Sequence, residues 1–172
     1  MDAYIIIVII FSILTMLLLM VLYFVNRLYI YKNRIDHAYE VVDELMDDRL
    51  GYVGRFSSFI ENELDTENNL VKRLNKLVDE YDSKNKDIKF VKKTGKYLDE
   101  LKVLYKVYPK LKDKYLYQTL SKGIDINQER LEYAMDTYDK EVKRYNDYVS
   151  NKYISMLKQL LKFPDYDYYK RK

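Results

Sequence analysis

The first part of the chain is almost entirely apolar. The 23 residues from Ala3 to Val25 contain no charge, no glycine and no proline. As an α-helix this segment would be about 34 Å long, slightly more than the roughly 30 Å hydrocarbon core of a bilayer. A helix of a small soluble domain is rarely apolar on every face over such a length. The segment, which includes Ile10 and Leu17, is therefore predicted to be a transmembrane helix.

A cleaved signal peptide is the alternative interpretation of this segment. A signal peptide has a basic start, a shorter apolar stretch and a cleavage site of small residues. Here only Met-Asp precedes the segment, which runs into Tyr23, Phe24, Asn26 and Arg27. The sequence thus favours an uncleaved anchor, and the segment contains neither a GxxxG seam nor an ionisable group.

Basic residues flank the apolar segment on one side only. Arg27, Lys32 and Arg34 follow it, and none precedes it. The positive-inside rule then predicts a single-pass protein of the cell membrane with its N-terminus outside and its remaining domain in the cytoplasm. We expect a transmembrane anchor at 1–25, a helical domain at 26–164 and a flexible basic tail at 165–172.

From Ile35 onward, apolar residues recur at intervals of three and four, which is typical of helices. The first such stripe ends near Leu64. Nothing between Val25 and Ile35 breaks a helix, so this helix is predicted to continue the membrane helix. Gly51 and Gly54 would weaken it and mark a bend.

Further helices are predicted along the rest of the chain. A turn at 65–69 precedes a helix at 70–81. The next interruption is expected at 82–87 and then at Lys93-Thr94-Gly95. A helical run over 97–105 ends at Tyr108-Pro109, and a short helix at 111–120 ends at Gly123. Asp125 or Asn127 would cap a last long helix that ends near Leu161 before Pro164. The sequence predicts an all-α fold, in which the transmembrane helix continues into an antiparallel, up-and-down, coiled-coil-like bundle of three to four helices.

The composition excludes several kinds of chemistry. The chain has no cysteine and one histidine, His37, which excludes thiolate sites and His-paired metal sites. No glycine-rich phosphate loop and no nucleophile elbow occur. The 30 basic and 27 acidic residues are interleaved, which argues against nucleic-acid binding. We therefore expect no cofactor, no metal and no catalytic activity.

Lysines cluster between residues 84 and 96. The plainer interpretation is a solvated loop and helix flank. The alternative is a patch that contacts anionic lipid, together with the basic C-terminus. The residues of that patch would be Lys92, Lys93, Lys96, Lys170, Arg171 and Lys172.

The C-terminal half resembles the LemA family. That family's pattern contains YP-x-LK, then a Glu followed by a basic-apolar pair, then two YN pairs around a Val. The matching residues here are Tyr108, Pro109, Leu111, Glu129, Arg130, Tyr138, Val142, Tyr145 and Asn146. Two departures are that the first YN is Tyr138-Asp139 and that the family's Pro-Asn in the first helix is absent. The resemblance implies a membrane-anchored helical protein without an established activity.

Arg49 matches the family's arginine in the first helix and falls on the apolar stripe. A buried guanidinium there would need a carboxylate partner, which Glu129 or Asp136 could supply. Alternatively, Arg49 reaches water from the edge of the stripe.

Two functions fit these observations. In the first, the bundle is a scaffold or adaptor that binds other proteins, or a second copy of itself, at the cytoplasmic face of the membrane. In the second, it is a peripheral module that contacts anionic lipid or the envelope through its lysine-rich segment and basic tail.

Overall fold

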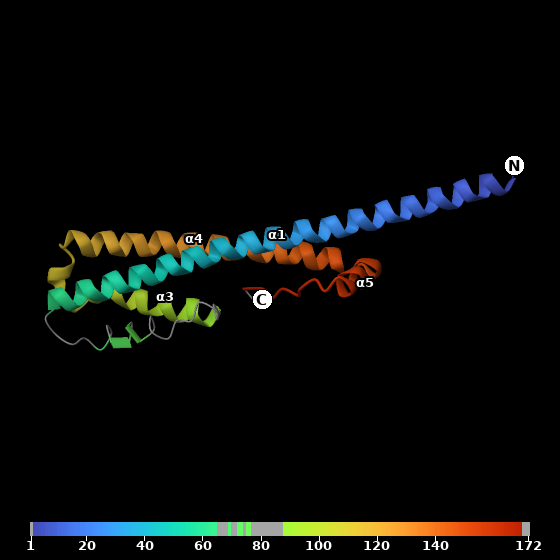
Figure 1. Cartoon of the computed structure of the whole chain (residues 1–172). Coiled ribbons are helices and arrows are strands. Elements are labelled where there is room, and N and C mark those ends of the chain that lie inside the picture. Colours follow the sequence, from blue (N-terminus) through green and yellow to red (C-terminus); the bar gives the residue numbers. More distant parts are fainter. Residues whose placement is uncertain (1, 65–68, 70–71, 74, 77–87, 170–172) are drawn as a thin grey trace. The chain divides into compact units, whose positions relative to one another are not determined.

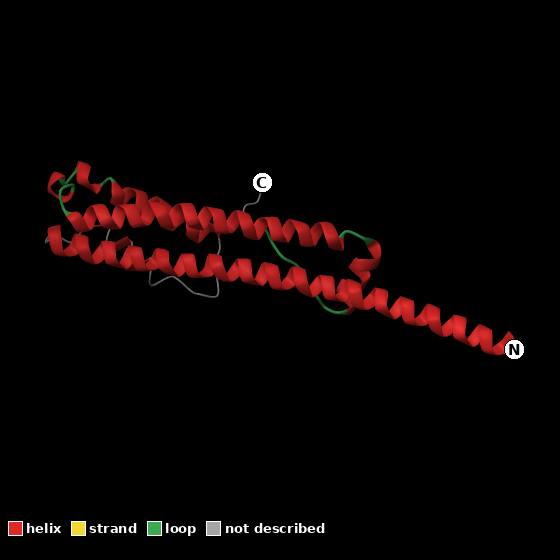
Figure 2. Cartoon of the chain, turned by 90° about the horizontal axis from the view of Figure 1, so that it is seen from above, coloured by secondary structure: helices red, strands yellow, loops and turns green. Residues whose placement is uncertain are grey.

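The computed structural model describes residues 2–64, 69, 72–73, 75–76 and 88–169. Its helices are α1 (Asp2–Leu64), α3 (Ile88–Lys102), α4 (Tyr115–Val149) and α5 (Lys152–Leu160). Two 3-10 turns, η1 (Leu104–Lys106) and η2 (Pro109–Leu111), connect α3 to α4. No strand occurs among these residues, and the predicted all-α fold is confirmed (Figure 1 and Figure 2). Residues 65–68 of the predicted turn, the loop at 82–87 and most of the helix at 70–81 lie outside the described residues. The expected interruption at 93–95 is wrong, because α3 passes through these residues.

α1 runs without interruption from the apolar segment to Leu64, so the predicted continuity with the first helix of the bundle is confirmed. The two aliphatic hydroxyls of the apolar segment belong to Ser12 and Thr15. They donate to the carbonyls four residues earlier at 2.9 and 2.8 Å, so their polar atoms are satisfied within the helix. The helix also passes through Gly51 and Gly54.

The predicted helix end at Gly123 is wrong. α4 passes through Gly123, and the expected caps Asp125 and Asn127 lie inside the same helix. A glycine inside a helix costs about 1 kcal/mol relative to alanine. Packing explains its presence, because a β-carbon at Gly123 would stand 2.5 Å from Cε1 of Tyr52. The glycine therefore serves a close approach of two helices and does not end one.

The last helix is also divided, contrary to the prediction of one helix to Leu161. α4 ends at Val149, and α5 begins at Lys152. Asn151 caps α5, because its side-chain oxygen accepts a hydrogen bond from the Tyr153 N–H at 3.0 Å. A side chain that bonds to nearby backbone in this way favours a helix start over a helix interior.

The chain forms two compact units. The first combines residues 1–37 with 139–168, and the second combines 38–138 with 169–172. In the first unit Tyr148 donates its hydroxyl proton to the Phe24 carbonyl at 3.5 Å. In the second, the Asn127 side chain donates to the Leu45 carbonyl at 3.0 Å. The Tyr117 ring also meets Phe56, so in the second unit later residues of α4 pair with earlier residues of α1 and the two helices run antiparallel (Figure 1).

The buried residues of α1 and α4 recur at the three- and four-residue spacing of a heptad repeat. On α1 they include Leu28, Ile35, Val42, Met46, Arg49, Val53, Phe56 and Ile60. On α4 they include Tyr117, Leu120, Ile124, Asn127, Leu131, Ala134, Tyr138, Val142 and Tyr145. These two rows of buried residues form the seam between α1 and α4. Each row includes one strongly polar side chain, Arg49 on α1 and Asn127 on α4.

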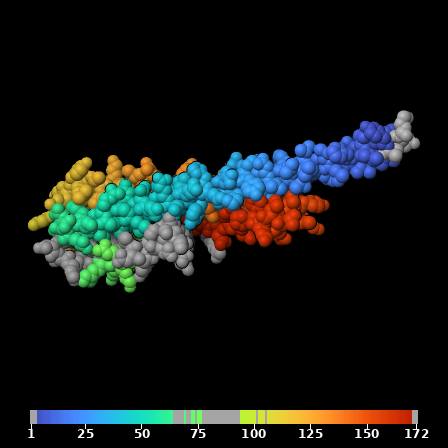
Figure 3. Space-filling view, viewed as in Figure 1, coloured from blue at the N-terminus to red at the C-terminus, as the bar shows by residue number. Residues whose placement is uncertain are grey.

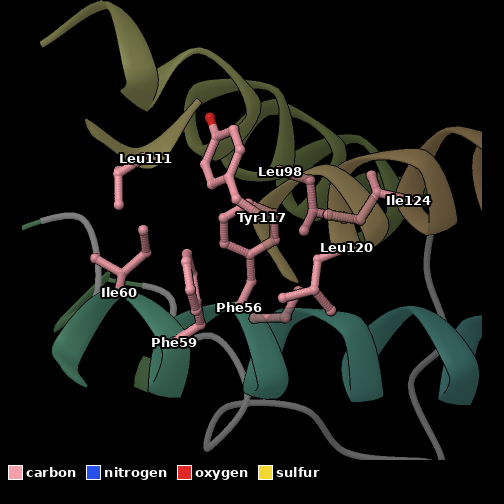
Figure 4. Packing of buried hydrophobic residues seen from close by; sticks show 9 residues of the cluster. Phe56, Phe59, Ile60, Leu98, Leu111, Tyr117, Leu120 and Ile124 are labelled. Carbon is pink, nitrogen blue, oxygen red and sulfur yellow. The ribbon is translucent and has the colours of Figure 1, made fainter. Parts of the chain in front are cut away.

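The apolar core of the second unit joins α1, α3, η2 and α4. Phe56 of α1 meets the Tyr117 ring of α4 edge-on, with centroids 5.3 Å apart. The Tyr117 hydroxyl donates to the Lys102 carbonyl at 2.7 Å, which fixes the connection between α3 and α4. Figure 4 shows the side chains that converge there, namely Phe56, Phe59, Ile60, Leu98, Leu111, Tyr117, Leu120 and Ile124.

The close approach of Tyr52 to Gly123 leads to a prediction about the free energy of unfolding. Gly123→Ala should lower the free energy of unfolding by about 1–2 kcal/mol, because overpacking costs about 1–3 kcal/mol and helix propensity returns at most about 1. Gly54→Ala is the matched control, since a β-carbon there meets nothing within 4 Å. It should raise stability by about 0.5–1 kcal/mol. Denaturant unfolding of the full chain in mild detergent measures both changes. Equal gains in the two variants would contradict the close approach.

Candidate functional site

The second unit contains a buried arginine. Arg49 is 2% exposed on α1. Its Nη2 atom lies against Gly95 of α3, where a β-carbon would stand 3.0 Å away. The Nε and Nη1 atoms have no hydrogen-bond partner among the described residues. The sequence allowed either a buried Arg49 or one that reaches water from the edge of the stripe. In the structure the guanidinium is buried.

Two carboxylates on different helices act on this guanidinium. Burial lowers the pKa of Arg49, and the charges of Asp99 on α3 and Glu132 on α4 oppose that shift. The sequence suggested Glu129 or Asp136 instead. Heptad spacing places residues on a face of α4, but the rotation of α4 and the position of α3 decide which carboxylate comes near Arg49.

Lys102 extends this charged group from α3 to α4. Its Nζ atom lies 2.9 Å from Asp99 and 2.6 Å from Asp125. Burial alone would lower the pKa of Lys102, but the hydrogen bonds that its ammonium group donates to Asp125 and Asp99 raise the pKa above its usual value. The group therefore ties three helices together. Nothing in it sets a nucleophile beside a base, and the described part of the chain contains no group of His, Asp and Glu that could hold a metal.

An open groove of 580 Å³ lies between the end of α1 and the start of α4 in the second unit. Its apolar wall includes Phe59 and Leu116, and Tyr115 stands beside it with 81% of its surface exposed. At the rim Lys114 forms an ion pair with Glu63 at 2.9 Å. Apolar walls with charged rims are typical of surfaces that bind other proteins.

The C-terminal strap, residues 161–168, lies against helices of the first unit. Tyr145 of α4 donates its hydroxyl proton to the Pro164 carbonyl at 2.8 Å, and its ring meets Tyr166 edge-on at 5.3 Å. Phe163 meets Tyr29 of α1 edge-on at 4.9 Å. Tyr166 lies in the segment that we expected to be a flexible tail, and besides its ring contact with α4 its hydroxyl donates to Asp36 of α1 at 3.5 Å.

Charge also surrounds Tyr145. Lys158 forms an ion pair with Asp165, and its Nζ atom lies 5.5 Å from the centroid of the Tyr145 ring. Burial, together with the charge of Asp165, raises the pKa of Tyr145 to about 12. The neutral phenol is thus the form that the strap contact requires.

The residues that carry the family resemblance do not meet in one site. Tyr108, Pro109 and Leu111 form the turn before α4, where Leu111 enters the core. Glu129 and Arg130 are exposed on α4. The remaining positions lie further along α4: Tyr138, Val142 and Tyr145 are buried, and Asn146 donates to the Tyr168 hydroxyl at 3.3 Å. The pattern therefore describes helix packing.

The predicted anchor is uncovered by the rest of the chain. A single helix in the described part is long and apolar enough to cross a membrane, and its most apolar stretch is 0% buried. Ile10 and Leu17 are exposed, Val25 is half-buried, and the Ala3 side chain lies outside the described residues. Figure 3 shows this part of α1 in blue, where it extends beyond the rest of the first unit.

Most of the predicted lipid patch cannot be placed. Lys96 is exposed on α3. The side chains of Lys92 and Lys93, and residues 170–172, lie outside the described residues. The sequence interpretation missed both the groove and the strap. The only signals for them were the adjacent Tyr115-Leu116 pair and the aromatic residues that alternate with Asp after Pro164.

Comparison with known proteins gives one match. The model of the LemA family matches residues 38–172, so the resemblance seen in the sequence is confirmed. No curated protein and no solved structure matches the chain.

Because burying the Arg49 charge is costly, we predict that the folded state does not need this charge for its stability. Arg49→Met should leave the free energy of unfolding unchanged or raise it by about 1–4 kcal/mol, because an apolar side chain of similar length removes the cost of burying the charge. Asp99 and Glu132 are exposed, so neither is stranded. Arg130→Met, at an exposed position, should change stability by no more than about 0.5 kcal/mol. A clear loss of stability in Arg49→Met alone would show that the attraction between Arg49 and these two carboxylates stabilises the bundle.

The strap predicts a pH dependence. A phenol whose pKa is raised from 10 to about 12 on folding stabilises the folded state below pH 10, and this contribution is lost between pH 10 and 12. Tyr145→Phe should cost about 0.5–1.5 kcal/mol at neutral pH by removing the bond to Pro164. The difference in stability between the unmodified chain and this variant should then shrink above pH 10. The control is Tyr133→Phe, at a position of α4 that is 73% exposed, which should change the free energy of unfolding by no more than about 0.5 kcal/mol.

Proposed function

The chain belongs to the LemA family, and we propose that it is a single-pass membrane protein whose bundle acts as a scaffold or adaptor for other proteins at the cytoplasmic face. In this proposal it works by contact, without a cofactor and without catalysis.

The uncovered apolar part of α1 supports the membrane anchor. Side chains from Tyr4 to Tyr23 are exposed, and burying that apolar area in a bilayer removes it from water. The orientation rests on Arg27, Lys32 and Arg34, which closely follow the apolar segment.

The groove between α1 and α4 is the observation that favours protein binding. Tyr115 and Leu116 are 81% and 50% exposed beside it. An exposed aromatic ring next to an apolar wall is the kind of anchor that contributes most to protein interfaces. The ion pair between Lys114 and Glu63 supplies a polar rim. Membrane anchoring would raise the local concentration of this surface for partners in the same membrane.

The lipid-binding alternative has less support. Of its residues, the structure describes the side chain of Lys96 alone, which is exposed on α3. We therefore retain protein binding as the proposed function and treat lipid contact by the lysine-rich segment as the second candidate. A second copy of the chain remains one of the partners that the groove would accept.

Photo-crosslinking in intact cells tests the proposed function. With a benzophenone amino acid in place of Leu116, we expect a discrete adduct with another protein in the membrane fraction. Because the bundle is proposed to lie in the cytoplasm, protease added to intact cells should leave this adduct undegraded. The mass of the adduct distinguishes a second copy of the chain from a different partner.

Lys122 is the matched control, since it is exposed on the same helix but does not line the groove. The crosslinker at Lys122 should give no adduct of that mass. Equal adducts at the two positions, or none at Leu116, would argue against the groove as the binding surface. Degradation of the adduct by external protease would instead reverse the orientation.

A further inference from the structure

α5 has an apolar face that packing within the first unit does not use. Its buried residue is Ile154, and Leu157 beside it is half-buried. Three other apolar side chains of α5, spaced three and four residues apart, are exposed instead of packed against the unit. These are Tyr153, Met156 and Leu160, which are 77%, 70% and 73% exposed.

Helical geometry shows how these residues are distributed. At about 100° per residue, Tyr153, Met156 and Leu160 form a strip beside the buried strip of Ile154 and Leu157. The opposite side carries the polar residues Lys152, Ser155, Lys158 and Gln159. α5 is therefore amphipathic, with an apolar arc that is only partly covered by its own unit.

Contacts on both sides of α5 place it at the end of the apolar segment. Before α5, Tyr148 donates its hydroxyl proton to the Phe24 carbonyl. After α5, the Phe163 ring packs on Tyr29 at 4.9 Å. The apolar segment ends at Val25. All these residues belong to the first unit, in which α5 lies beside α1 (Figure 1 and Figure 3).

We propose that α5 is an interfacial helix, whose strip of Tyr153, Met156 and Leu160 lies in the boundary between headgroups and acyl chains of the bilayer that α1 crosses. This inference rests on the membrane anchoring of the proposed function. A helix with one apolar and one basic or polar face is suited to that boundary, and a tyrosine prefers it. Lys152 is placed on the polar face to meet anionic headgroups.

The bilayer is favoured over a protein as the occupant of this strip for two reasons. First, α1 would hold α5 beside the membrane at all times, so that the strip meets lipid without a separate binding event. Second, nine residues present a strip too small for a stable protein interface, which buries about 800 Å² on each partner. With α1 as a tether, even weak partitioning of a short helix becomes effective.

Spin labels in the full chain test this placement. The chain has no cysteine, so single replacements give unique labelling sites. Three variants are needed, each reconstituted in vesicles of phosphatidylcholine and phosphatidylglycerol. Met156→Cys reports the apolar strip, Gln159→Cys reports the polar face of the same helix, and Leu14→Cys reports the apolar segment of α1. Each label is exposed to oxygen, which concentrates in lipid, and to a nickel chelate, which stays in water.

We expect the label at Leu14 to be accessible to oxygen and not to the nickel chelate. The label at Met156 should also favour oxygen, to a smaller degree, whereas the ratio of the two accessibilities should invert at Gln159. Equal, water-like ratios at Met156 and Gln159, with Leu14 in lipid, would overturn the interfacial helix but leave the anchor intact. A water-like ratio at Leu14 would instead overturn the anchor.

A second copy of the chain on this strip is a separate outcome. It would protect the Met156 label from both reagents and broaden its spectrum through coupling between labels. Dilution with unlabelled chain would then narrow the spectrum, and this result would also overturn the lipid assignment.

Discussion

Burial of the seam between α1 and α4 is the interaction on which the rest of the structure depends. Each helix alone would expose a stripe of apolar side chains at heptad spacing, and pairing the two removes both stripes from water. Because the pairing is antiparallel, the start of α4 lies beside the end of α1, which creates the groove. The same pairing places the end of α4 beside the end of the apolar segment, and α5 follows from there.

Polar and small residues within the seam set its register. The Asn127 side chain bonds the Leu45 carbonyl, and one turn further along α1 the Arg49 guanidinium lies against Gly95 of α3. Tyr52 then packs over Gly123. An apolar seam alone tolerates sliding by a heptad, whereas a buried hydrogen bond or a close backbone approach is satisfied at one register only. These contacts therefore favour one register of the two helices.

The features suited to function lie away from this core. The groove and the exposed strip of α5 are surfaces, while the residues of the family pattern mostly hold helices and turns together. Leu111 and Tyr145 are examples, since one fills the core and the other carries the strap. In the proposed function, specificity would come from exposed side chains such as Tyr115, which lie outside the buried seam.

The sequence by itself determined the apolar segment, the helical class and the stripes of α1 and α4, because these follow from local periodicity and from the cost of exposing apolar surface. It also identified Arg49 as a charge within a stripe. The predictions of a helix end at Gly123 and of one last helix to Leu161 were wrong, since a glycine can end a helix or allow a close approach, and an asparagine such as Asn151 can lie inside a helix or cap the next one. Only the tertiary structure decided between these, and it also selected Asp99 and Glu132 as the charges near Arg49. Both outcomes depend on how neighbouring helices are rotated and aligned, and that geometry is set by packing over distances that no local pattern encodes.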